Sequence, residues 1–170
     1  DAAVSNGHAV SGYDSGMWDT LIRTDSHIIA KSPKKTDGSP ASGGPSLSNV
    51  DAIFFAGHRE VALEASQKED LLQFVRDGGG FVAAHTGLTA FESWPEFGEL
   101  IGARFDGHPI TGDGVIINEN PGFPATKHFP AAFRFNDEFY QPRLFSRDAI
   151  DVLLRLDVKP GDTRVHADGD

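Results

Sequence analysis

DAIFFAGHREVALEASQKEDLLQFVRDGGGFVAAHTG, residues 51–87, is the stretch that decides the fold class. Residues 52–56 form a continuous apolar run that ends at Gly57, and residues 81–84 form a second apolar run. Runs of this kind are typical of strands that are buried on both faces of a parallel sheet. We therefore expect two neighbouring parallel strands here.

The segment between these two runs has the pattern of an amphipathic helix. Ser66 and Glu69 have capping-box spacing, and the segment stops at the three glycines 78–80. Its apolar positions form one stripe, made of Leu71, Leu72, Phe74 and Val75. Strand, helix and strand in this order predict a βαβ unit with a right-handed crossover.

Weaker patterns surround this unit. Residues 17–22 have helical spacing and precede a short apolar run at 27–30, so we expect a helix followed by a strand. The Pro-, Gly- and Ser-rich residues 32–49 predict a surface loop. A second capping box at Ser93 with Pro95 in the first helical position predicts a short helix ending at Gly102. Further strands are expected at 114–118, 133–135 and 151–156. Together, these expected helices and strands predict a three-layer α/β sandwich with a mainly parallel sheet and extra strands, in one domain spanning residues 1–170.

Composition narrows the classes of partner. The 170 residues carry 15 Lys and Arg against 25 Asp and Glu, a net charge of −10, which disfavours nucleic acid and anionic membrane surfaces. No apolar run approaches the roughly 20 residues that span a bilayer. Cysteine is absent, which excludes disulfides and thiolate chemistry within these residues. A cytoplasmic protein and one exported after removal of a signal peptide both fit, and a homo-oligomer is compatible with the sequence.

Histidines follow the predicted strands. Ligands of open parallel sheets bind beyond the carboxyl ends of the strands, where His58 and His85 stand; His8 lies before the first expected helix. Residues 78–87 have the strand-then-sharp-turn layout of a nucleophile elbow, with His85 in the place of the nucleophile. An imidazole there suits a base, a hydrogen-bond donor or a ligand. The alternative is a histidine that only caps a strand by bonding to backbone.

Five motifs run in the order of a known family. They are QKxxLLxFVxxGGGFVxxH (67–85), WPxFxxLIG (94–102), FxxHP (105–109), PATxH (124–128) and DExY (137–140). In this order they resemble the trehalose-utilisation (ThuA-like) family of the class I glutamine amidotransferase-like superfamily, most clearly over residues 50–157. The resemblance implies a flavodoxin-like sheet. It also implies that part of the family's N- and C-terminal elements is lacking, because the family has a strand before its first histidine and further strands after a segment like 164–168.

The resemblance further implies a role in carbohydrate catabolism, with glycosides or keto-disaccharides as substrates. In the related amidotransferases the elbow residue is a cysteine, so His85 argues against glutamine hydrolysis. The leading hypothesis is an enzyme that uses His85 as acid, base or polarising group, supported by Glu138 and His108. Its rival is a non-catalytic sugar-binding or interaction module on the same fold.

Residues 137–140 supply further candidates for the site. If this segment is extended, Asp137 points to one face and Glu138 with Tyr140 to the other, so one carboxylate faces inward and needs a partner. We take Glu138 and Tyr140 as the pair that faces the site, with a salt bridge from Glu138 to Arg134 or Arg143 as the alternative.

Two more residues have two interpretations each. Pro109 restrains the backbone of His108, which could hold its ring at a fixed angle or leave it a simple loop residue. Trp94 could stack on a sugar ring or staple its helix to the core. The residues proposed to contact substrate are His8, His58, Asp137, Tyr140 and Trp94.

A metal is the less favoured alternative. His8, His58, His85 and His108 lack the spacing that puts two rings on one element, so no bound metal and no cofactor is expected. A zinc-like divalent ion with His85 as its first ligand is the competing hypothesis.

Overall fold

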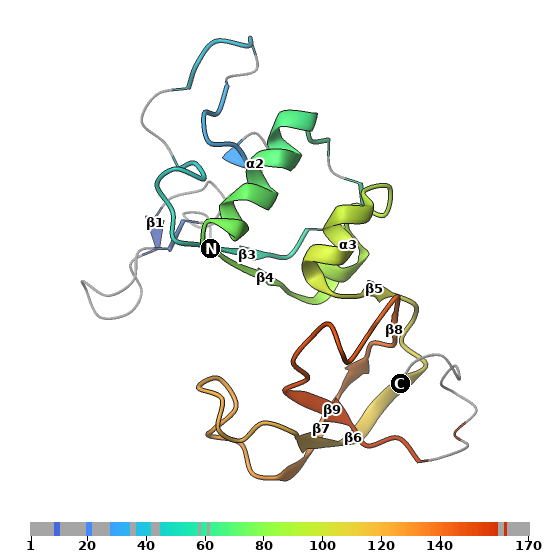
Figure 1. The fold of residues 1–170 in the computed structure, drawn as a ribbon. Helices are drawn as coiled ribbons and strands as arrows, with labels where there is room; N and C mark the ends of the chain where they lie inside the picture. Colours follow the sequence, from blue (N-terminus) through green and yellow to red (C-terminus); the bar gives the residue numbers. More distant parts are fainter. Residues whose placement is uncertain are drawn as a thin grey trace. The chain divides into compact units, whose positions relative to one another are not determined.

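The computed structural model describes residues 9–10, 20–21, 28–34, 37–41, 45–57, 59–60, 62–159 and 162. They belong to two compact units, Asp1–Ala90 and Phe91–Asp170 (Figure 1), so the single domain expected over 1–170 stays a prediction. The first unit contains β1 (Ala9–Val10), β2 (Thr20–Leu21), β3 (Ala52–Phe55), α2 (Ala65–Arg76), β4 (Gly80–Ala83) and the 3-10 helix η2 (His85–Thr89). The second contains α3 (Pro95–Ile101), β5 (Arg104–Phe105), β6 (Ile110–Asn118), β7 (Ala132–Phe139), β8 (Pro142–Arg143) and β9 (Leu154–Leu156). No helix in the described ranges is long and apolar enough to cross a membrane.

Strands β3 and β4 pair in parallel, with Ala52 opposite Gly80 and Phe55 opposite Ala83. Helix α2 connects them (Figure 1), so the predicted strand–helix–strand unit is confirmed. Phe55 and Phe81 stack with ring centroids 5.8 Å apart on the half-buried face of this pair.

The two faces of the β3–β4 pair differ, which departs from the expected burial on both. Phe54 and Val82 lie opposite each other in the pairing and are 73% and 51% exposed. Strand residues alternate between faces, so this exposed face is the one that also carries Ala52 and Gly80. The structure covers only one face of these strands, whereas the apolar run alone suggests two.

Helix α2 begins two residues earlier than the sequence pattern suggests. Glu64 is the N-cap and forms a capping box with Gln67, whose Oε1 accepts a hydrogen bond of 3.0 Å from the Glu64 backbone N–H. The expected box between Ser66 and Glu69 is therefore wrong, because Glu and Gln at this spacing satisfy the same backbone groups. Gln67 also donates from Nε2 to the Ile29 carbonyl, which ties the helix to the preceding segment.

The start of the chain differs from its expected pattern where it is described. Residues 20–21 form β2, antiparallel to β1, instead of part of a helix; the rest of 17–22 lies outside the described residues. Residues 28–30 turn, with the Ala30 N–H bonded to the Ile28 carbonyl, and do not form a strand. Ala30 and Leu47 are buried and bonded through their backbones, so this turn contributes to the core of the first unit.

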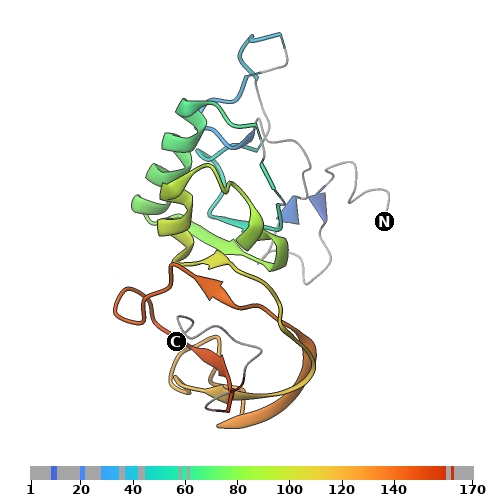
Figure 2. The same ribbon diagram turned by 90° about the vertical axis from the view of Figure 1, so that its right-hand side faces the viewer.

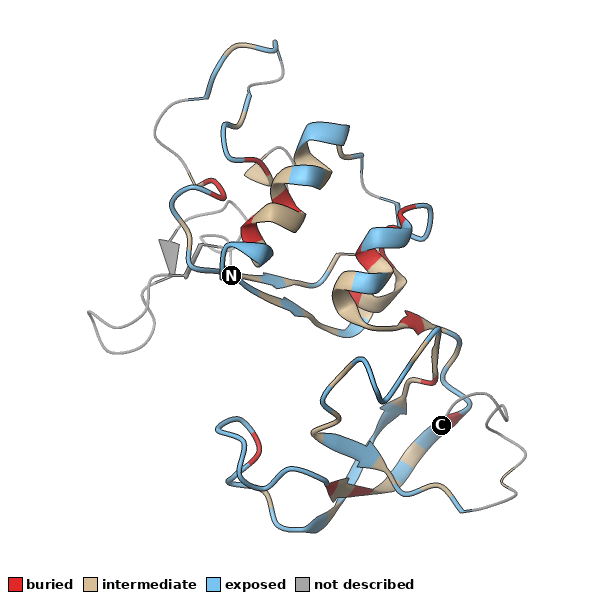
Figure 3. Cartoon of the chain, in the orientation of Figure 1, coloured by how far each residue is buried: buried red, intermediate tan, exposed pale blue. Residues whose placement is uncertain are grey.

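Helix α3 runs from Pro95 to Ile101 and is capped by Gly102, the residue at which its sequence predicts the end. Its N-cap is Trp94 and not Ser93. Gly102 takes the left-handed conformation (φ 75°) that ends many helices, and a side chain there would meet Ile150. The aromatic core of this unit consists of Phe91, Trp94 and Phe97, all buried. Figure 3 shows buried positions on α3 in red.

The expected late strands form a separate antiparallel sheet of order β7–β6–β9. Strands β6 and β7 are longer than predicted and curve together (Figure 2), whereas β9 is shorter, covering Leu154–Leu156 only. A further two-stranded pair joins β5 to β8, with Arg104 opposite Arg143.

Candidate functional site

His85 stands at a sharp turn directly after strand β4. Its φ is +48°, while Ala84 before it is extended (φ −114°, ψ 140°) and η2 begins at His85 itself. Positive φ is uncommon outside glycine and strains the backbone, and such positions cluster at functional sites. The side chain is exposed. The backbone thus has the strand-then-sharp-turn layout that the sequence predicts, with the imidazole at its apex.

Contacts with the end of β3 hold this turn in place. The Ala84 N–H donates to the Phe55 carbonyl (2.9 Å), and the Thr86 hydroxyl donates to the Ala56 carbonyl (3.1 Å). Gly87 is buried, and a Cβ on it would lie 2.8 Å from the Phe55 oxygen. Only glycine therefore allows η2 to approach β3 this closely, and the position of His85 depends on that approach.

A second group of candidate residues meets in the unit Phe91–Asp170. The rings of His108 and Tyr140 stack with centroids 6.2 Å apart, and Phe105 contacts Tyr140 edge-on at 4.6 Å. Backbone hydrogen bonds from Asp106 to Gln141 and from Gln141 to Gly107 join the two segments that carry these rings. The three rings, Phe105, His108 and Tyr140, are called the aromatic cluster below.

Two carboxylates give the aromatic cluster its electrostatic character. Burial raises the pKa of the Tyr140 hydroxyl above its ordinary value, and the negative charges of Glu138 and then Asp137 raise it further. Tyr140 therefore stays a protonated hydrogen-bond donor at neutral pH. Asp137 accepts a hydrogen bond from the Glu138 N–H at 2.8 Å.

The expectation that one of these carboxylates faces inward is wrong. Asp137 and Glu138 are both exposed, because both faces of strand β7 are largely open. The alternative salt bridge is also absent among the described residues, since Arg143 pairs with Glu92 and Asp106 while Arg134 forms no ion pair there.

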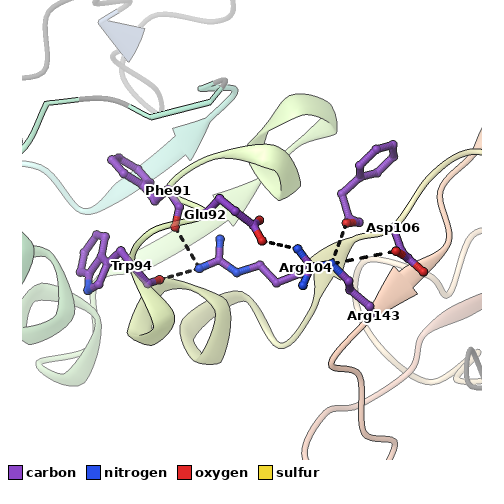
Figure 4. Close-up of polar contacts among 7 residues, drawn as sticks. Phe91, Glu92, Trp94, Arg104, Asp106 and Arg143 are labelled. Carbon is purple, nitrogen blue, oxygen red and sulfur yellow. Dashed lines mark hydrogen bonds and ion pairs between the residues drawn. The ribbon is translucent and has the colours of Figure 1, made fainter.

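Two arginines of this unit form polar networks that sequence reasoning missed (Figure 4). Arg104 is 3% exposed and donates to the carbonyls of Phe91 (3.0 Å) and Trp94 (2.5 Å). Arg143 donates to the Glu92 carboxylate and to the Phe105 carbonyl (3.4 Å). No sequence signal marks Arg104 as buried, because its acceptors are backbone groups.

Trp94 is buried in the aromatic core. It is 5% exposed, stacks on Phe97 at 5.6 Å and meets Phe91 edge-on at 5.5 Å. This packing favours the helix-staple interpretation over the sugar-stacking one.

The remaining candidates are placed only in part. His108, Tyr140 and the two carboxylates share one unit, whereas His85 belongs to the other, so their convergence on one site stays a prediction. His8 and His58 lie outside the described residues. Within the described ranges, no three His, Asp or Glu side chains are grouped to hold a metal ion.

The chain has a parallel strand pair joined by a helix, a strained histidine after the second strand and, later in the sequence, an antiparallel sheet. These features define a mixed α/β protein. The family model ThuA, described as trehalose utilisation, matches residues 30–168. The chain therefore belongs to the ThuA family.

Comparison with solved structures supports the same fold. A crystal structure of a ThuA-like protein from Bacteroides uniformis ATCC 8492 matches with a TM-score of 0.60 and 22% sequence identity. The match covers 79% of this chain and 52% of the other, so the chain spans about half the length of that protein. Among curated proteins no relative matches.

Proposed function

We propose that the protein is an enzyme of carbohydrate catabolism that acts on a glycoside or keto-disaccharide through histidine acid–base chemistry. The family's description, trehalose utilisation, supports the substrate class. The observation that carries the proposal of an enzyme is the backbone of His85, whose φ of +48° holds an exposed imidazole at the end of a parallel strand. An imidazole titrates near neutrality and can accept and return a proton there.

The aromatic cluster supplies features that suit a sugar. Rings such as those of His108 and Tyr140 offer flat apolar area to the C–H face of a pyranose. The exposed carboxylates of Asp137 and Glu138 can accept hydrogen bonds from hydroxyl groups, and the protonated Tyr140 hydroxyl can donate one. We assign Glu138 and His108 to support the proton transfer at His85, and Asp137 and Tyr140 to bind substrate.

The finer features of the fold belong to this proposal. The proposal includes a three-layer, flavodoxin-like arrangement, with the described parallel pair as part of a larger sheet. His8 and His58 complete the proposed substrate contacts. The proposed chemistry uses no cofactor, and a zinc-like ion bound by His85 is the alternative. Glutamine hydrolysis is not proposed, because the 170 residues contain no cysteine.

The charge of the chain bears on its partners. A net charge of −10 disfavours nucleic acid and anionic membranes, and the proposed ligand is a small carbohydrate.

A non-catalytic sugar-binding module is the second candidate. The observation that favours it is that the aromatic cluster and its carboxylates are assembled within one unit, without any contribution from His85. Such a module would bind sugar equally well when His85 is replaced.

The test is turnover of glycosides and 3-keto-glycosides by the full-length protein and its His85 variants. His85→Asn is the sharper substitution, because asparagine tolerates positive φ whereas alanine adds backbone strain. His128→Asn is the matched control, since His128 is an exposed histidine outside the proposed site. We expect His85→Asn to lower kcat by about 100-fold or more and the control to leave it unchanged. Equal turnover by both variants would remove His85 from the mechanism.

A further inference from the structure

Strand β7 has an outer edge on which no other strand pairs within the part of the chain that the structure describes, although its Glu138 N–H donates to the Asp137 carboxylate. It pairs with β6 over an uninterrupted register, from Ile110 opposite Phe139 to Ile117 opposite Ala132, and it ends the sheet order β7–β6–β9. Its eight residues contain no proline and no bulge, which are two of the features that protect such an edge. Phe135 on this strand is 50% exposed.

Charged side chains on β7 restrict what can pair with this edge. One face of the strand carries three exposed polar residues at every second position, Arg134, Asn136 and Glu138. The side chains of Arg134 and Glu138 form no ion pair with any residue that the structure describes. A new strand on this edge must therefore offer charges that match them.

A second copy of β7 matches in one antiparallel register. In an antiparallel pair, residues that stand directly opposite each other point to the same face of the sheet. A two-fold axis that relates two copies of β7 must therefore lie between one residue and the same residue of the other copy. With the axis at Asn136, Arg134 of each copy stands opposite Glu138 of the other, and Phe133 stands opposite Phe139. The neighbouring axis at Asp137 would put Asp137 opposite itself, and the axis at Phe135 would leave Arg134 opposite Asn136.

We propose that two copies of the protein associate edge to edge through β7, antiparallel about a two-fold axis at Asn136. The occupant of the edge is a second copy of this chain, because its own sequence supplies two symmetric Arg134–Glu138 pairs and two Phe133–Phe139 pairs. The association joins the sheet of each copy into one six-stranded antiparallel sheet. It also brings the guanidinium of Arg134 from the second copy next to Glu138, which neighbours the aromatic cluster.

Sedimentation equilibrium of the full-length protein with charge-swapped variants tests this proposal. We expect wild-type dimers, and a dissociation constant about tenfold or more higher for Arg134→Glu and for Glu138→Arg, because each puts like charges opposite each other twice. The double variant carrying both changes restores opposite charges and is expected to regain the dimer. Lys127→Glu is the matched control, because it makes the same charge change on an exposed residue of the loop after β6.

A cross-link at the axis tests the register even if a charge variant fails to fold. The 170 residues contain no cysteine, so Asn136→Cys introduces one thiol in them, opposite its own copy. We expect it to form a covalent dimer with a short thiol-specific cross-linker, and Lys127→Cys not to do so. A wild-type protein that is monomeric at about 100 µM contradicts the proposal. So does a dimer that survives Arg134→Glu, or equal cross-linking of the two cysteine variants.

Discussion

Arg104 and Arg143 lie directly opposite each other in the β5–β8 pair, yet their guanidinium groups have different surroundings (Figure 4). Arg104 is buried and donates to the carbonyls of Phe91 and Trp94, while the partly exposed Arg143 donates to the Glu92 carboxylate. Two like charges opposite each other in a sheet repel. Separate acceptors for each guanidinium make the arrangement tolerable, and Arg104 fixes the chain that leads into α3.

Replacing Arg104 is expected to destabilise the protein strongly. Arg104→Met keeps much of the apolar stem but removes the two guanidinium hydrogen bonds to the carbonyls of Phe91 and Trp94, which then keep their backbone donors. We expect the loss of these two charge-assisted bonds to cost about 2–4 kcal/mol of unfolding free energy. Arg155→Met is the matched control, because Arg155 is exposed and pairs with Glu119 and Asp157, contacts worth about 0–1 kcal/mol. Urea unfolding measures both losses, and equal losses would show that burial of Arg104 contributes little.

Gly87→Ala is expected to disturb the turn that carries His85. The added Cβ would meet the Phe55 carbonyl oxygen at 2.8 Å, so η2 must move away from β3 at a cost of about 1–3 kcal/mol. Gly122→Ala meets nothing closer than 3.7 Å and is expected to change stability by less than about 0.5 kcal/mol. Thermal unfolding compares the two variants. If His85 acts from this turn, turnover falls for Gly87→Ala and not for Gly122→Ala.

The pKa of Tyr140 is expected to depend on Glu138. Burial raises this pKa first and the charges of Glu138 and Asp137 add to it, so Glu138→Gln should move it down toward its ordinary value. Because the pKa of Tyr140 is higher in the folded protein than its ordinary value, Tyr140 contributes stability at pH values below the ordinary tyrosine pKa. This contribution is lost as the pH rises through the pKa of the folded protein. Tyrosine ionisation is followed by ultraviolet absorbance in the wild type and in Glu138→Gln. Subtracting the titration of the same protein with Tyr140→Phe isolates the signal of Tyr140. Glu119→Gln is the control, because it removes the charge of a carboxylate in the same unit that is distant from Tyr140 in sequence. It should leave the pKa of Tyr140 unchanged.

Asn118 is expected to anchor the loop between β6 and β7. It is buried, and its Nδ2 donates to the carbonyls of Thr126 (3.0 Å) and Phe129 (3.3 Å), while its Oδ1 has no partner among the described residues. Asn118→Ala should cost about 1–3 kcal/mol and speed amide hydrogen exchange in residues 119–131. Asn120→Ala removes a side chain without such bonds and should do neither. Unchanged exchange in Asn118→Ala would contradict the anchoring role.

The pairing of β3 with β4 could be predicted from sequence because each run is apolar and a capped helix separates them. The same runs could not show that Phe54 is exposed, since an apolar side chain does not reveal what covers it. The sharp turn at His85 was predictable from small residues around it, whereas its φ of +48° depends on contacts with residues of β3.

The aromatic cluster was only partly predictable. Alternation along β7 separates Asp137 from Glu138, but it cannot tell that β7 is an edge strand with both carboxylates in solvent. Phe105 was not a candidate at all, and it joins Tyr140 through the pairing of β5 with β8, a contact between segments far apart in sequence. The hydrogen bonds of Arg104 to backbone carbonyls leave no trace in the pattern of residue types.

The burial of Trp94 between Phe91 and Phe97 gives the second unit an optical signal of its own. An indole shielded from water fluoresces at shorter wavelength than one in solvent, and Trp18 is the only other tryptophan in the 170 residues. In a Trp18→Phe background, a red shift of the emission therefore reports loosening around α3. The same spectrum can separate variants that perturb this packing from those that change only the chemistry at His85.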